Sequence, residues 1–209
     1  MKVLIVNGSP HQKGTTNAAL EEIINILNQE NIETEMIWLG NEPIASCIGC
    51  GYCRKNQEGC FRNDIVNEFQ KKAKKADGFI FGSPVHYAAP SGSITSFLDR
   101  VFYSADKETF RLKPAAVVVA ARRAGTTSAY EQLIKYLGIS EMLIVSSGYW
   151  NMVFGNSADQ SKEDLEGLQT MRTLAKNMAY CLKCLEIAKE NGVELPKHEK
   201  EKHRTNFIR

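Results

Sequence analysis

The sequence lacks a long hydrophobic run. Among its 209 residues the longest purely apolar stretch is Ala115–Ala121, only seven residues, whereas a membrane-spanning helix needs about 20. The chain after Met1 enters a strand-like pattern at once and shows no apolar segment with a small-residue cleavage site. We therefore expect no membrane partner and no secretion, and we place the protein in the cytoplasm.

An excess of charge of one sign is also missing. Lys and Arg number 26 and Asp and Glu 24, so the formal net charge is +2. The slight excess lies in residues 197–209, which hold five Lys or Arg and two Glu. A nucleic-acid surface needs a basic stripe across the fold, so we expect no nucleic-acid partner. With 43% apolar residues the chain can form a core, which excludes disorder.

Internal repeats and low-complexity segments are absent, and strand-like and helical patterns alternate instead. Strands are expected over residues 2–7, 32–39, 78–82, 115–121 and 142–146. Helices are expected over residues 14–29, 64–76, 91–102, 127–137 and 161–191. This alternation predicts an α/β fold, a parallel sheet with helices on both faces. Residues 1–195 form one domain in this interpretation, and 196–209 form an extended tail.

Ligands of such sheets bind beyond the carboxyl ends of the strands. The loop after the first strand offers hydroxyls at Ser9, Thr15 and Thr16 and an amide at Asn17, next to a helix start. Backbone N–H groups and a helix N-terminus bind anions. The loop has neither the Gly-Lys-Ser/Thr ending of a P-loop nor the G-x-G-x-x-G fingerprint, which favours a monophosphate held without metal. An ordinary capped turn is the alternative, since Ser and Thr favour helix starts.

Cysteine is the one conspicuous abundance, because four of the six cysteines lie within fourteen residues, in a loop over residues 45–60. They are Cys47, Cys50, Cys53 and Cys60. Three thiolates at this spacing can surround one face of an iron–sulfur cluster, and the longer arm can return the fourth. Gly49 and Gly51 would allow the tight turns. Zinc binding, for which the spacing is crowded, and a redox dithiol are the alternatives.

The other two cysteines, Cys181 and Cys184, stand three residues apart in the final helical pattern. Their neighbours Met178, Leu182 and Leu185 are apolar and recur at helical spacing. Since free cysteine behaves as a small hydrophobic residue, we expect both to be packed in the core rather than to bind a metal.

Three motifs together resemble those of a known family. They are Ser9-Pro10-x-x-x-Gly14-Thr15-Thr16, Gly82-Ser83-Pro84-Val85-His86-Tyr87 and Phe97-Leu98-Asp99-Arg100. The sequence resembles the flavodoxin-like NAD(P)H-dependent FMN reductases, and the cysteine loop resembles their iron–sulfur flavoprotein branch. The resemblance covers nearly the whole chain, including the ending Arg204–Arg209. It departs from the family at His11, where Arg is frequent, and at Thr15, where Asn is frequent.

The resemblance implies a flavodoxin-like, doubly wound, five-stranded parallel sheet of order 2-1-3-4-5 and an FMN site. The implied phosphate-binding residues are Ser9, His11, Gly14, Thr15, Thr16 and Asn17. The implied residues along the flavin ring are Pro84, Val85, His86, Tyr87, Arg122 and Gly125. The arginine side chain is expected to stabilise reduced flavin or to bind the phosphate of NAD(P)H, with a surface or subunit-interface position as the alternative. The four clustered cysteines are implied to hold a [4Fe-4S] cluster.

The function implied is electron transfer from NAD(P)H through FMN to a small acceptor, such as a quinone, free flavin, azo or nitro compound. No catalytic side chain is expected, because the flavin N5 carries the reaction. The alternative is an iron–sulfur electron-transfer protein with ferredoxin as the donor. The apolar residues of the loop 150–154 lead us to expect a homo-oligomer, a dimer or tetramer, with the basic tail on a neighbouring subunit.

Overall fold

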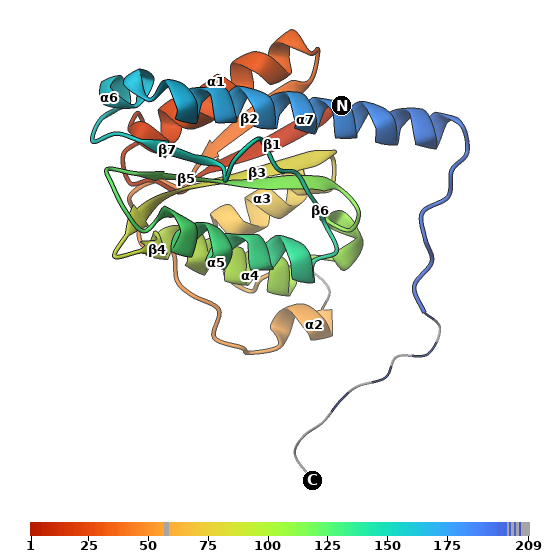
Figure 1. Cartoon of the computed structure of the whole chain (residues 1–209). Coiled ribbons are helices and arrows are strands. Elements are labelled where there is room, and N and C mark those ends of the chain that lie inside the picture. Colours follow the sequence, from red (N-terminus) through yellow and green to blue (C-terminus); the bar gives the residue numbers. More distant parts are fainter. Residues whose placement is uncertain (57–58, 200, 202, 204, 206–209) are drawn as a thin grey trace.

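A computed structural model describes residues 1–56, 59–199, 201, 203 and 205 of the chain, and its centre is a parallel sheet (Figure 1). The order along the sheet is β2-β1-β3-β5-β6. These strands are β1 (Lys2–Asn7), β2 (Glu33–Trp38), β3 (Gly78–His86), β5 (Pro114–Ala121) and β6 (Leu143–Ile144). The expected doubly wound α/β fold and its strand order are confirmed. The division into a domain and a tail at residue 195 stays a prediction.

Two layers of helices cover the sheet (Figure 1). The helices α1 (Thr15–Gln29) and α7 (Leu165–Glu190) pack on the face formed by Val3 and Ile5. Leu4 and Val6 face the other layer, which contains α3 (Ile65–Ala73), α4 (Gly92–Ser104) and α5 (Thr126–Ile139). Because side chains alternate along a strand, one short apolar run fills both cores.

The expected fifth strand, residues 142–146, is divided in the structure. Only β6 pairs with the start of β5, and a separate strand, β7 (Met152–Phe154), pairs with its end. Between them the buried Asn151 continues the pairing, since its Nδ2 donates to the Val117 carbonyl at 3.1 Å and its own carbonyl accepts from Val119 N–H at 3.0 Å. Residues 152–154 therefore lie in the sheet, so the expectation of a loop there is wrong, and the homo-oligomer inferred from it stays a prediction.

The third strand is longer than expected and turns back on itself. It extends to His86 and pairs antiparallel with β4 (Ala89–Pro90). The two residues between, Tyr87 and Ala88, have φ of +49° and +59°. Both lie in the left-handed region, which residues with a Cβ seldom adopt, so no turn motif in the sequence marks this hairpin.

The final helix is interrupted where a single one, residues 161–191, is expected. A short α6 (Ala158–Glu163) ends at Asp164, and α7 begins directly after it. One oxygen of the Asp164 carboxylate accepts from Gly167 N–H at 2.9 Å, and the other accepts from Phe154 N–H at 2.7 Å. The carboxylate thus caps α7 and anchors it to β7, which a helical apolar pattern alone does not reveal.

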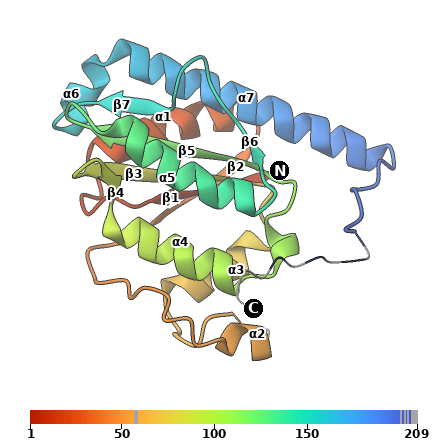
Figure 2. The ribbon, with the colours of Figure 1, turned by 60° about the horizontal axis from the view of Figure 1, so that its bottom comes forward.

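The cysteine-rich segment and the tail both lie outside the layers (Figures 1 and 2). The segment leaves β2, runs beneath α4 and contains the unexpected short helix α2 (Tyr52–Asn56); its residues 57 and 58 lie outside the described chain. The start of the tail lies on its own chain, because Arg111 donates to the Pro196 carbonyl at 2.6 Å and His198 lies 2.7 Å from Glu108. The ending 206–209 and residues 200, 202 and 204 are outside the described residues. In the described part, no helix has the length and apolarity to cross a membrane.

A charged network at the β2 edge predicts a pH-dependent stability. The Glu35 carboxylate lies 2.8 Å from Lys2 Nζ and 2.5 Å from Lys72 Nζ. Hydrogen bonds from Lys2 and then Lys72 lower the pKa of Glu35 below 4.5. A lowered folded-state pKa stabilises the protein above the unfolded-state pKa, and this contribution disappears as pH falls through the folded value. We expect Glu35→Gln to reduce the free energy of unfolding at pH 7 by about 1 kcal/mol.

Urea unfolding of both proteins between pH 7 and pH 2.5 measures this difference. It should shrink steadily below pH 4.5, the ordinary value for the carboxyl group. The control is Glu21→Gln, which removes an exposed carboxylate that joins none of the ion pairs among the described residues. A difference between the wild type and Glu35→Gln that is the same at all pH values would contradict the expectation.

Candidate functional site

A cavity of about 790 Å³ opens at the carboxyl ends of β1, β3 and β5. Nine of the twelve expected cofactor-binding residues line it: Ser9, His11, Gly14, Thr15, Thr16, Pro84, Val85, His86 and Arg122. They come from separate loops that parallel pairing brings to one edge of the sheet. The cavity is wide enough for a flavin-sized ligand and stays open on one side, as an electron donor or acceptor would require.

The buried side chain of Asn7 holds the loop after β1 in place by hydrogen bonds. Its Oδ1 accepts from Ser9 N–H at 3.0 Å, and its Nδ2 lies 3.4 Å from both the Gln12 carbonyl and Asn17 Oδ1. Trp38 adds a hydrogen bond from its indole N–H to the Ser9 carbonyl at 2.8 Å. Asn17 is buried in this network and does not line the cavity, so its position fits a role in holding the loop rather than in contacting a ligand.

The start of α1 completes an anion-binding loop. Gly14 occupies the N-cap position with extended backbone, and no side chain in the described chain caps this helix. Its first N–H groups therefore keep their hydrogen-bonding capacity, and the helix dipole favours a negative charge there. Thr15 Oγ1 donates to the Gly155 carbonyl at 3.2 Å, which draws the loop after β7 to the same place. Lys13, which no sequence motif marks, also lines the cavity and brings a positive charge.

The opposite wall is the β3–β4 hairpin. Pro84, Val85 and His86 line the cavity, but Tyr87 is 106% exposed at the tip of the turn and points away from the fold. Gly125 does not line the cavity either. It has a φ of +89°, and a Cβ built on it would lie 2.7 Å from Ala88 Cα. Gly125 therefore lies against the hairpin and supports it from behind.

Several lining residues carry no motif in the sequence. Trp38 is the last residue of β2 and Asn41 lies just after it, and residues 155–158 follow β7. The position of Trp38 at the carboxyl end of an expected strand is the one signal that could have indicated it. Residues 155–158 could not be placed, because the strand before them is only three residues long.

The four clustered cysteines line one small pocket of about 20 Å³ beneath α4. Gly49 and Gly51 have φ of +64° and +72°, the left-handed region that glycine adopts readily, and the expected tight turns stay a prediction. Cys53 Sγ lies 3.8 Å from the Tyr103 carbonyl, and burial raises the pKa of the Cys53 thiol. Cys60 is held at its main chain, where Asn67 Oδ1 accepts from Cys60 N–H at 3.0 Å and Asn67 Nδ2 donates to the Cys60 carbonyl at 2.8 Å.

The four thiols line one pocket, but they are not arranged as the ligands of a bound ion. A pocket of 20 Å³ has room for about one water molecule. Within residues 1–56 and the described part from 59 onward, no three His, Cys, Asp or Glu side chains are arranged to hold a metal. The donor set nevertheless fits an iron–sulfur cluster, whose irons take four cysteine thiolates, provided the loop opens to admit it.

Cys181 and Cys184 lie on α7, on the opposite side of the sheet from the cysteine-rich segment (Figure 1). Cys181 is half-buried and packs against the core, as expected. Cys184 is exposed, so the expectation of core packing is wrong for this residue.

The sheet order, the open cavity at its carboxyl edge and the uncapped α1 define a flavodoxin-like α/β protein. Solved structures share this fold, including RosB with a bound riboflavin-phosphate derivative (TM-score 0.70, 14% identity, covering 100% of this chain and 92% of that one). Another is a flavodoxin from the domain Archaea (TM-score 0.59, 16% identity, 88% and 99% covered).

The family model described as NADPH-dependent FMN reductase matches residues 1–157, and the chain belongs to this family. An iron–sulfur flavoprotein of Methanocaldococcus jannaschii is 33% identical over 192 residues, covering 88% of this chain and 99% of the relative. An FMN-dependent NADPH-azoreductase of Staphylococcus saprophyticus is 25% identical, with 56% and 59% covered. The protein is therefore an FMN-dependent oxidoreductase.

Gly125→Ala tests the support of the hairpin wall. The new methyl group would meet Ala88 and Val85 at a backbone angle that alanine rarely adopts. We expect a loss of about 2 kcal/mol in the free energy of unfolding and weaker FMN binding, since Val85 lines the cavity. Urea unfolding and flavin fluorescence titration measure the two effects.

The matched control, Gly138→Ala, lies near the other end of α5 and has no atom within 4 Å of the built Cβ. Alanine favours a helix over glycine, so this variant should gain up to about 1 kcal/mol and bind FMN as the wild type does. Equal stability of the wild type and Gly125→Ala would show that the hairpin does not depend on this contact.

Proposed function

We propose that FMN binds in the cavity at the carboxyl edge and that the protein transfers electrons from NAD(P)H to a small acceptor, such as a quinone, free flavin, azo or nitro compound. The observation that carries the proposal is the cavity itself, with the anion-binding loop on one side and the β3–β4 hairpin on the other. Bound FMN supplies hydride chemistry at its N5 atom, so the protein needs no acid or nucleophile of its own.

The residues of the cavity have distinct roles in this proposal. The hydroxyl of Ser9 and the first N–H groups of α1 bind the phosphate. Thr15, whose hydroxyl donates to the Gly155 carbonyl, holds the loop after β7 beside them. Pro84 and Val85 lie along the flavin ring and exclude water from it. Arg122, exposed at the rim, is placed to bind the phosphate of NAD(P)H or to offset negative charge on reduced flavin.

A second candidate is electron transfer through a [4Fe-4S] cluster, with ferredoxin as the donor and FMN as a two-electron store. Two observations favour it: all four clustered cysteines line one pocket, and a relative 33% identical to the chain is an iron–sulfur flavoprotein. Cys47, Cys50, Cys53 and Cys60 would hold the cluster. The expected homo-oligomer and cytoplasmic location are compatible with both candidates and are proposed for each; the acceptor and donor are the partners that differ.

Anaerobic absorption spectra distinguish the two candidates. We expect purified, reconstituted protein to show flavin bands near 450 nm, about four irons per chain and a broad shoulder near 400 nm (approximate values). Bleaching within seconds by NADH or NADPH supports the first candidate. Bleaching by reduced ferredoxin alone supports the second, and absence of bound FMN would contradict both.

Substitution of the anion-binding loop tests where the phosphate binds. Ser9→Ala removes one hydroxyl that lines the cavity. Hydrogen bonds to a charged group contribute about 1.5–3 kcal/mol, so we expect FMN affinity to fall at least about tenfold in this variant. Riboflavin, which lacks the phosphate, should bind the wild type and Ser9→Ala equally.

Fluorescence titration with both flavins measures these affinities. Thr95→Val is the matched control, because Thr95 Oγ1 bonds only within α4. Parallel losses for FMN and riboflavin would place the phosphate elsewhere.

A further inference from the structure

Arg100 is the most deeply buried cation of the described chain, with only 1% of its surface exposed. It lies in the middle of α4, within a motif of the sequence that had no assigned role. Its Nη1 and Nη2 atoms bind the two oxygens of Asp64 at 2.6 and 2.8 Å. Asp64 in turn caps α3, since it accepts from Val66 N–H at 3.1 Å. A paired guanidinium of this kind is rigid and fixed in direction.

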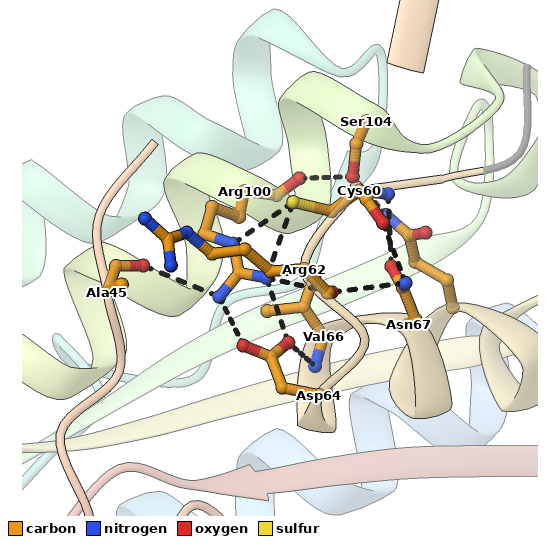
Figure 3. Close-up of polar contacts among 9 residues, drawn as sticks. Ala45, Cys60, Arg62, Asp64, Val66, Asn67, Arg100 and Ser104 are labelled. Carbon is orange, nitrogen blue, oxygen red and sulfur yellow. Dashed lines mark hydrogen bonds and ion pairs between the residues drawn. The ribbon is translucent and has the colours of Figure 1, made fainter. Parts of the chain in front are cut away.

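The rest of the guanidinium faces the cysteine-rich segment. Arg100 Nε and Nη2 both lie 3.3 Å from Cys60 Sγ. The same group donates to the Ala45 carbonyl at 3.4 Å and to the Arg62 carbonyl at 3.3 Å. One side chain therefore joins both ends of the segment, two residues before its first cysteine and at its last (Figure 3).

Burying a guanidinium is costly unless its charge is paired and its donors are satisfied. A guanidinium group keeps its charge at any ordinary pH, so Arg100 needs an anionic partner in this buried position. Asp64 balances the charge, and two donors still point at sulfur. Among the hydrogen bonds of the described residues, Cys60 is the one clustered cysteine whose sulfur accepts from a side chain.

We propose that Arg100 is a positioning residue that fixes Cys60 as a ligand of the [4Fe-4S] cluster and raises the reduction potential of that cluster. This inference rests on the cluster in the second candidate function. Hydrogen bonds to the sulfurs and the net charge nearby set the potential of such clusters. Because reduction adds negative charge, a buried cation with two donors on a ligand sulfur stabilises the reduced form more than the oxidised form.

The test compares Arg100→Gln, Arg100→Lys and Asp64→Asn with the wild type, all reconstituted anaerobically with iron and sulfide. Iron and labile sulfide are counted, and the potential is measured by a redox titration followed by electron paramagnetic resonance. We expect Arg100→Gln to bind less iron. The cluster that remains should show at least a tenfold shift of the reduction equilibrium toward the oxidised form, which is 59 mV for one electron.

Asp64→Asn removes a negative charge but keeps an oxygen that can cap α3, so its potential should shift in the opposite direction. A merely structural role would not give shifts of opposite sign. Arg100→Lys keeps the charge without the fork of donors and should fall between the wild type and Arg100→Gln. The matched control is Arg172→Gln, which breaks a 2.6 Å pair with Glu22 on the other side of the sheet; it should leave iron and potential unchanged.

A second measurement uses the protein without iron. Alkylation by iodoacetamide, followed by mass spectrometry of each cysteine peptide, should modify Cys60 at least tenfold faster in Arg100→Gln than in the wild type, with Cys184 unchanged. If Arg100→Gln does not fold by circular dichroism, the same measurements on Arg100→Lys decide the question.

Full iron, an unchanged potential and unchanged alkylation of Cys60 in a folded Arg100 variant would overturn this inference and leave the cluster intact. Wild-type protein that takes up no iron would instead overturn the cluster, and this inference with it. The two failures are thus distinguished by the wild type alone.

Discussion

The parallel pairing of β1 with both β2 and β3 is the constraint on which the structure depends. Parallel neighbours require every connection to cross a face of the sheet, so all carboxyl ends lie at one edge. The topology alone therefore brings the loops after β1, β3 and β5 together. The connection after β2 is the exception: it leaves this edge and carries the four cysteines beneath α4 (Figure 2). The open cavity thus lies at the carboxyl edge of the sheet, and the cysteine pocket lies apart from it, beneath α4.

The fold was predictable where the local pattern and the long-range packing agree. Val3, Leu4, Ile5 and Val6 form an uninterrupted apolar run because both faces of β1 are covered, and this indicates a central parallel strand directly. The apolar pattern of the sequence does not predict strand and helix ends that depend on a single polar side chain. Asn151 completes the sheet edge by bonding to Val117, and Asp164 ends one helix and starts the next. Neither role follows from residue type or spacing, since both depend on partners distant in the sequence.

The candidate site shows the same division. Residues that follow an expected strand, such as Ser9 and Pro84, line the cavity because topology alone brings them there. Tyr87 does not line the cavity, because it lies at the exposed tip of the β3–β4 hairpin, which no turn motif in the sequence indicates. Asn17 does not line the cavity either, because its side chain is hydrogen-bonded to Asn7 inside the loop. The grouping of the four cysteines was predictable from spacing, but the guanidinium that faces Cys60 comes from residue 100 and enters only with the packing of α4.

The division of the outer strand into β6 and β7 has a consequence for association. Exposed edges of sheets are templates on which further strands can add, and proteins protect them with short strands and with charge. At one edge here the strands are two and three residues long, and a buried asparagine fills the gap between them. At the other edge, β2 presents Glu33 and Glu35, both held by Lys2. Short strands at one edge and charged side chains at the other thus disfavour the addition of a further strand, which makes helices and loops the better surfaces for contacts between copies.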